Sequence, residues 1–220
     1  MTDTQKQRAA WNLEDIARAI AADIADGSFV NLGIGRPEAI ANYIPADKEI
    51  IFHTENGLLG MGPAPDKDHE NLELINAGKK PVTAVSGASF IHQADSLAMI
   101  RGSHIDVCVM GAFQVSASGD LANWSTGQAL AVPAVDGVMD LSSGAKKIFI
   151  MMTHVTKYDA AKLVDHLTYP ATSRGMVSRV YTDLAIIDII NGAFHLRDIV
   201  PGLTFDELQA HTDAPLLKIE

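Results

Sequence analysis

One carboxylate stands where catalytic groups are commonly found in α/β proteins. Residues 50–52 form an apolar run that predicts a strand, and Glu55 follows this run, directly before Asn56 and Gly57. In open α/β sheets, ligands bind in the crevice at the carboxyl ends of the strands. Its position makes Glu55 a candidate catalytic residue, since a carboxylate can act as an acid, a base or a covalent nucleophile.

The Asn56-Gly57 pair also has a purely structural interpretation. Asn-Gly is a strong short signal for a type I′ β-hairpin turn. Residues 58–63 are apolar and rich in glycine, and they lack the alternation of a strand that pairs back. We therefore expect a loop over residues 58–70 and not the second strand of a hairpin.

Two glycines mark a second candidate site, at a turn between a strand and a helix. Gly33 and Gly35 follow the apolar run 29–32, and Pro37 suits the first turn of a helix. A dinucleotide-binding fingerprint is disfavoured, because Pro37 and Glu38 stand where its third glycine would be needed. Two glycines still let backbone N–H groups approach an anion. A tight turn without a ligand remains the alternative.

The other reactive residue types show no catalytic pattern. The eight histidines are scattered without metal-ligand spacing, so no metal site is predicted. Cys108 lies in the apolar run 107–110, where we expect a buried, unreactive thiol; a single cysteine forms no intrachain disulfide. The sequence has neither a Gly-x-Ser-x-Gly elbow nor a P-loop lysine motif. Glu55 is left as the main candidate.

Composition narrows the class of protein. The 220 residues are 47% hydrophobic and 20% charged, which fits one globular domain over residues 1–220. The formal net charge of −10 argues against non-specific binding to nucleic acid. No apolar run reaches the roughly 18 residues of a membrane span, and the polar start of the sequence does not resemble a signal peptide. We expect a cytoplasmic protein that binds neither nucleic acid nor membranes.

The elements that must position these residues alternate along the chain. Asn12 is a good N-cap for a first helix, apolar runs that suit buried parallel strands follow, and Asn191-Gly192 predicts a late hairpin. This order predicts an α/β fold, with an open, mainly parallel sheet, helices on both faces and a C-terminal antiparallel hairpin. Strands are expected at 29–32, 50–52, 80–85, 106–110, 147–152, 177–182, 185–190 and 193–200, and helices at 13–24, from 37, 94–100, 160–166 and 205–209.

Several separate motifs together resemble the β subunits of class I 3-oxoacid CoA-transferases. They run from Leu13 to Leu217, nearly the whole chain, in matching order and spacing, which is more specific than any one motif. The matching segments are residues 31–35 (Asn-Leu-Gly-Ile-Gly), 55–63 (Glu-Asn-Gly-Leu-Leu-Gly-Met-Gly-Pro), 74–79, 99–102, 111–115 and 119–124.

The resemblance implies covalent catalysis that needs no metal or redox cofactor. The family's catalytic glutamate falls on Glu55, whose carboxylate would carry first the acyl group and then CoA, with ping-pong kinetics. The family's oxyanion-hole glycine falls on Gly137. Contacts with the substrate and CoA are expected from the active-site turn and neighbouring segments, through Asn31, Gly33, Gly35, Arg36, Asn56, Gly111 and Gln114.

Within the family, the similarity is closest to members that act on 3-oxoadipate, through residues 123–127, 133–135 and 205–208. It implies CoA transfer from succinyl-CoA to 3-oxoadipate during the degradation of aromatic compounds. It also implies a partner, the CoA-transferase α subunit, commonly in an α2β2 assembly with the active site at the α/β junction. An acidic chain offers few groups for the CoA phosphates, so the partner is expected to supply much of the CoA site. Two alternatives remain: acetoacetate or another short acid as acceptor, and a non-catalytic or sugar-phosphate isomerase relative of the same fold.

Some positions depart from the family pattern. Asp136 adds a charge beside Gly137, and Thr54 replaces the usual serine. Arg36 stands where a small or apolar residue is usual; beside an anion-binding turn it would pair with a substrate carboxylate or stay solvated. Residues 168–173 lack the usual ending of their segment. These departures bear on the acceptor more than on the chemistry.

Overall fold

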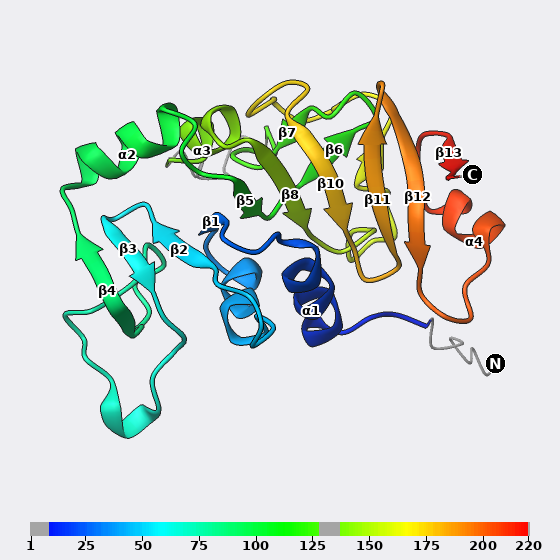
Figure 1. Cartoon of the computed structure of the whole chain (residues 1–220). Helices are drawn as coiled ribbons and strands as arrows, with labels where there is room; N and C mark the ends of the chain where they lie inside the picture. Colours follow the sequence, from blue (N-terminus) through cyan, green and yellow to red (C-terminus); the bar gives the residue numbers. More distant parts are fainter. Residues whose placement is uncertain (1–8, 128–136, 220) are drawn as a thin grey trace.

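A computed structural model describes residues 9–127 and 137–219 as one large sheet and one small one, with helices around them (Figure 1). The large sheet has the strand order β13-β12-β11-β10-β8-β5-β1-β2-β3-β4. It is parallel from β2 to β10 through its centre, and antiparallel pairs flank this centre on both sides. This mixed, mostly parallel open sheet confirms the predicted α/β class. Its strands are β1 (Phe29–Leu32), β2 (Ile51–Thr54), β3 (Leu58–Met61), β4 (Ala84–Phe90), β5 (Val107–Met110), β8 (Lys147–Met151), β10 (Val177–Tyr181), β11 (Ala185–Ile190), β12 (Ala193–Ile199) and β13 (Leu216–Lys218).

Alternating side chains of the central strands divide the core into two layers. In β5, Cys108 and Met110 belong to one buried cluster, whereas Val107 and Val109 belong to the other. Successive side chains of a strand point to opposite faces, so both faces of the sheet are covered. The continuous apolar runs in the sequence are therefore those of a parallel sheet buried on both sides.

Helices supply the cover on each face. α1 and the 3₁₀ helix η1 contribute to the cluster that contains Val107, while α2, α3 and α4 contribute to the cluster that contains Cys108. The predicted helices on both faces are thus present. Among residues 9–127 and 137–219, no helix is long and apolar enough to span a membrane. The helices are α1 (Leu13–Asp23), η1 (Arg36–Asn42), η2 (Lys67–His69), α2 (Gln93–Arg101), α3 (Val138–Gly144) and α4 (Phe205–Ala210).

The predicted C-terminal hairpin is confirmed. Strands β11 and β12 pair antiparallel and turn at Asn191-Gly192. Both turn residues have positive φ, 52° and 76°, as a type I′ turn requires. The Asn-Gly signal was sufficient here because both flanking segments were themselves predicted as strands.

The loop predicted over residues 58–70 is wrong at its start. Leu58–Met61 forms β3, which pairs antiparallel with β2, with Thr54 opposite Leu58. The other edge of β3 pairs with β4, far along the chain. The hairpin interpretation of Asn56-Gly57, set aside because residues 58–63 lack alternation, is the one that the structure supports. Pairing with β4 stabilises a strand that its own residues do not indicate.

Two further elements differ from expectation. The strand predicted at 80–85 lies at Ala84–Phe90, and the helix predicted at 160–166 is absent. That segment instead holds the short strand β9 (Leu163–Val164), which pairs with β6 (Gln114–Ser116) in a small sheet completed by β7 (Leu121–Ala122). Leu163 and Val164 are buried there, so packing overrides helix propensity.

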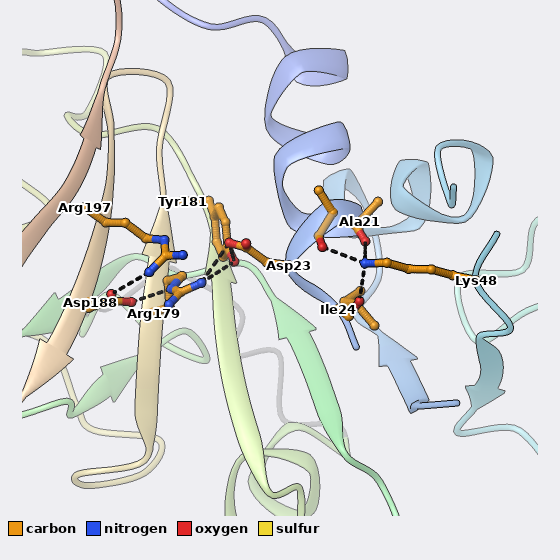
Figure 2. Close-up of polar contacts among 9 residues, drawn as sticks. Ala21, Asp23, Ile24, Lys48, Arg179, Tyr181, Asp188 and Arg197 are labelled. Atoms are coloured by element: carbon orange, nitrogen blue, oxygen red, sulfur yellow. Dashed lines mark hydrogen bonds and ion pairs between the residues drawn. The ribbon is translucent and has the colours of Figure 1, made fainter. Parts of the chain in front are cut away.

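A network of charges joins α1 to the sheet (Figure 2). Arg179 of β10 binds Asp23 at the end of α1 with an Nη1–Oδ2 distance of 2.8 Å, and also binds Asp188 of β11. Tyr181 donates its hydroxyl to Asp23 at 2.7 Å, and Arg197 of β12 approaches Asp188 at 3.5 Å. One guanidinium therefore holds two carboxylates from different elements.

Lys48 stabilises the end of the same helix (Figure 2). Its ammonium donates to the carbonyl oxygens of Ala22 and Ile24, each at 2.6 Å, and to that of Ala21 at 3.4 Å. The last carbonyls of a helix lack intrahelical partners and carry partial negative charge, so a lysine there favours helix termination.

Arg179→Met is expected to lower the free energy of unfolding by about 3 kcal/mol, because it leaves two partly buried carboxylates without their shared cation. Urea unfolding measures the change. Arg174→Met is the control: Arg174 is 80% exposed and pairs loosely with Asp120 at 3.6 Å, so it should change stability by less than about 0.5 kcal/mol. Equal stability of the two variants would show that the network does not hold α1.

Candidate active site

Glu55 lies in the turn between β2 and β3, at the edge where the parallel strands β1, β2 and β5 end. The turn closes when the Gly57 N–H donates to the Thr54 carbonyl at 3.0 Å. Gly57 has φ 107°, and a Cβ added to it would lie 2.2 Å from the Ile91 carbonyl oxygen. Only glycine fits there, and the constrained turn fixes the backbone of Glu55.

A buried hydrogen-bond network lies directly behind this turn. The Asn31 amide donates to His53 Nδ1 at 3.0 Å and to the His53 carbonyl at 3.2 Å. His53 Nε2 therefore carries the proton and donates to Ser96 Oγ at 2.8 Å, and the Ser96 hydroxyl donates to the Thr54 carbonyl at 3.3 Å. Burial lowers the pKa of His53 to about 4, so the ring is neutral at pH 7. The network ties β1, β2 and α2 together beside Glu55.

Gly137 packs directly against the Glu55 carboxylate. A Cβ added at Gly137 would lie 2.5 Å from both Cδ and Oε2 of Glu55. The backbone at Gly137 has φ −61° and ψ 5°, which other residues adopt readily. The backbone conformation would accept a side chain here, but that side chain would displace the Glu55 carboxylate. On the other side, Gln93 Nε2 donates to Glu55 Oε1 at 3.3 Å.

The Glu55 carboxylate opens into a pocket of about 510 Å³, a size typical of small-molecule sites. Five of the predicted site residues line it: Asn31, Gly33, Arg36, Glu55 and Gly111. The rest of the lining is largely apolar, with Thr153, Asn123 and Lys162 among the polar exceptions. A carboxylate in such a pocket can attack an electrophilic carbonyl from which bulk water is partly excluded.

Two glycines line the pocket in different surroundings. At Gly33, a Cβ would lie 3.0 Å from the Val109 carbonyl oxygen, so β1 and β5 approach too closely there for a side chain to fit easily. At Gly111, no atom lies within 4 Å of an added Cβ, and a side chain would project into open space. Both residues follow central strands, where the sequence placed the crevice.

Four predicted site residues lie outside the pocket lining: Gly137, which packs against the Glu55 carboxylate, and Gly35, Asn56 and Gln114. The Gly35 N–H donates to Glu38 Oε2 at 2.9 Å, and the exposed Asn56 side chain donates to the Ile75 carbonyl at 2.9 Å. Gln114 is buried and holds the segment at Thr168, donating to its hydroxyl and accepting from its backbone N–H, each at 2.9 Å. These contacts hold segments of the chain next to the site. Asp136 and residues 133–135 lie outside the described residues.

Sequence reasoning missed three side chains: Gln93, which donates to Glu55; Ser96, which belongs to the buried network beside Glu55; and Lys162, which lines the pocket. Gln93 and Ser96 come from α2, and Lys162 precedes β9. Burial, with repulsion from Arg36, lowers the pKa of Lys162 to about 8, against an opposing effect of Asp183. No local pattern in the sequence marks these residues, because long-range packing alone brings them near Glu55. Among the described residues, no group of three or more His, Cys, Asp or Glu side chains could hold a metal ion.

Comparisons with known proteins agree with this geometry. Residues 13–211 match the family model described as coenzyme A transferase. The chain is 53% identical to the β subunit of 3-oxoadipate CoA-transferase from Acinetobacter baylyi, over 93% of this chain and 94% of that protein. It is 42% identical to the β subunit of succinyl-CoA:3-ketoacid coenzyme A transferase from Helicobacter pylori, over 91% and 96% of the two chains.

Solved structures share the fold. An acyl-CoA transferase from Escherichia coli O157:H7 superposes with a TM-score of 0.72 at 17% identity, over 93% of this chain and 41% of that longer chain. Glutaconate coenzyme A-transferase from Acidaminococcus fermentans gives a TM-score of 0.66 at 18% identity, over 96% and 89%. The family model, the close relatives and the carboxylate at the carboxyl edge of the sheet lead to one conclusion: this chain belongs to the coenzyme A transferase family.

Proposed function

We propose that this chain is the β subunit of an enzyme that transfers CoA from succinyl-CoA to 3-oxoadipate, with Glu55 as the covalent carrier. The observation that carries the proposal is the Glu55 carboxylate, held against Gly137 at the mouth of a pocket of about 510 Å³. The relatives that are β subunits of 3-oxoadipate CoA-transferases, at 51–53% identity over 93% of this chain, support the substrate.

The reaction proceeds through two acyl exchanges. The Glu55 carboxylate attacks the thioester carbonyl of succinyl-CoA, the C–S bond breaks, and a mixed anhydride and CoA thiolate form. The thiolate attacks the glutamyl carbonyl, succinate leaves, and a glutamyl-CoA thioester remains. A carboxylate of 3-oxoadipate then attacks that thioester and expels CoA thiolate, which attacks the acceptor carbonyl of the new anhydride and regenerates Glu55.

Gly137 has two roles in this proposal. Each attack creates an oxyanion that backbone N–H donors must stabilise, and one such donor typically contributes about 3 kcal/mol to lowering the barrier. Because Gly137 has no side chain, the Glu55 carboxylate can also occupy the space beside it. Asn31, Gly33, Gly111 and Arg36 line the space for the substrate. Gly35, Asn56 and Gln114 hold the surrounding segments.

The proposal includes a partner. The α subunit, in an α2β2 assembly, supplies much of the CoA site, because this chain has a formal net charge of −10 and the CoA phosphates are anionic. This chain, as a single domain, then provides the carrier glutamate and the acyl pocket. The reaction takes place in the cytoplasm during degradation of aromatic compounds.

A reconstitution experiment tests the proposal. The chain is purified alone and together with its α partner, and transfer from succinyl-CoA is measured with 3-oxoadipate, acetoacetate and other short acids. We expect negligible transfer by the lone chain, and the highest kcat/KM with 3-oxoadipate in the assembled enzyme. Mass spectrometry after incubation with succinyl-CoA should find a borohydride-sensitive CoA adduct on Glu55. A higher kcat/KM with acetoacetate would show that acetoacetate, and not 3-oxoadipate, is the acceptor. Absence of both transfer and adduct would favour a non-catalytic relative.

A further inference from the structure

Two cations line the pocket. Arg36 comes from η1, and Lys162 comes from the segment before β9. They lie close enough for the charge of Arg36 to lower the pKa of Lys162. Two like charges in one pocket are unfavourable unless an anion joins them.

Neither cation is neutralised by an acid of the chain. In the parts of the chain that the structure describes, no hydrogen bond or ion pair within 4.0 Å joins the Arg36 guanidinium or the Lys162 ammonium to a carboxylate. Lys162 is half-buried, whereas Arg36 is exposed. Two half-buried cations elsewhere have partners: Arg179 binds Asp23 and Asp188, and Lys48 binds helix carbonyls. Asp183, the acid that acts on Lys162, already accepts from the His154 N–H at 2.7 Å.

We propose that Lys162, together with Arg36, forms the subsite for the non-reacting carboxylate of a dicarboxylic acyl group attached to or leaving Glu55. This inference rests on the proposed function, in which donor and acceptor are both dicarboxylates. One carboxyl group reacts at Glu55, and the other stays charged and must enter a largely apolar pocket. A charged hydrogen bond from a partly desolvated lysine offsets that desolvation.

The same pair would discriminate among substrates. An acyl group without a second carboxylate forms no ion pair with Lys162 and Arg36, so these residues do not raise its affinity. The pocket therefore favours succinyl over butyryl groups, which have the same four-carbon chain. Lys162 acts as a specificity-determining residue and takes no part in bond making.

The test is Lys162→Met in the assembled enzyme, with succinyl-CoA and butyryl-CoA as donors. We expect kcat/KM to fall roughly 10- to 100-fold for succinyl-CoA, in line with the loss of a charge-assisted hydrogen bond. The value for butyryl-CoA should fall by much less. Lys162→Arg keeps the charge and should retain most of the preference. Lys157→Met, an exposed lysine outside the pocket, is the matched control and should behave as wild type.

The pH dependence gives a second readout. Lys162 must be protonated to bind a carboxylate, and its pKa is about 8. The preference for succinyl-CoA should therefore be complete below that pH and decline as pH rises through it. The charged and titratable groups around Lys162 are Arg36, Glu55, Asp183 and the neighbouring His154. Lys162→Arg should remove this decline.

The possible outcomes distinguish failure of this inference from failure of the proposed function. An equal fall for both donors would mean that Lys162 binds the CoA phosphates or supports the fold, and would overturn the inference. An unchanged ratio of the two donors would do the same. If the wild-type assembly transfers CoA from neither donor, the proposed function itself fails, whatever the variant does.

Discussion

Glu55→Gln is expected to reduce CoA transfer by roughly 10⁴-fold or more, because an amide cannot form the anhydride or the thioester that carries the acyl group and CoA. Glutamine keeps the size of the side chain beside Gly137, and position 55 is only partly buried. The free energy of unfolding should therefore change by less than about 1 kcal/mol. Steady-state transfer from succinyl-CoA and intact-mass detection of the CoA adduct measure the two effects together.

Glu73→Gln provides the control for this change. Glu73 is an exposed glutamate in the segment between β3 and β4, so its variant should keep wild-type transfer and form the adduct. If Glu55→Gln retains more than about 1% of wild-type activity, or if the CoA mass appears on another residue, Glu55 is not the obligatory carrier.

The location of Glu55 was predictable from local sequence, because it depends only on where an apolar strand ends. An apolar run predicts a buried strand, and the carboxyl end of such a strand in a parallel sheet borders a crevice. The structure has this arrangement, with β2 next to β1 and Glu55 just past its end. The α1 cap at Asn12 and the Asn191-Gly192 hairpin were predictable for the same reason, since neighbouring residues alone determine them.

The form of the turn at Glu55 was predicted wrongly, because the hairpin signal of Asn56-Gly57 was set aside in favour of a loop. Leu58–Met61 looks like a loop by its composition, yet it pairs with β2 on one edge and with β4 on the other. The turn at Gly57 joins β2 to β3, and Gly57 packs against Ile91, which directly follows β4. The pairing with β2 is local, but the pairing with β4 joins distant segments and leaves no periodicity in the sequence that would reveal it.

Which residues make up the site could also not be fully predicted from local sequence. Lys162 and Gln93 lie far from Glu55 in the chain, and only the assembled sheet and α2 bring them to the carboxylate or its pocket. Gly137 was placed in the site by resemblance alone, without any local signal. The structure supplies a physical reason for that glycine, because the Glu55 carboxylate occupies the space of a side chain.

Gly137→Ala is accordingly expected to lower transfer roughly 100-fold, since displacing a catalytic group by about 1 Å has an effect of that size. The added Cβ would lie 2.5 Å from Glu55 Oε2, so the carboxylate must swing away from its position. The fold should tolerate the change, because φ −61° suits alanine and the clash is with the end of a flexible side chain. Transfer kinetics and the rate of adduct formation should fall together, with the melting temperature nearly unchanged.

Gly144→Ala, at the other end of the helix that Gly137 caps, separates this effect from simple crowding. A Cβ at Gly144 would lie 2.2 Å from the Ile100 carbonyl oxygen, and that backbone atom cannot rotate away. This variant should lose stability by overpacking, while any folded enzyme should keep normal turnover per active site. If Gly137→Ala instead melts like Gly144→Ala and retains activity per folded molecule, then Gly137 is needed for packing. Loss of activity in a stable Gly137→Ala protein would show that the bare backbone at Gly137 sets the position from which the carboxylate attacks.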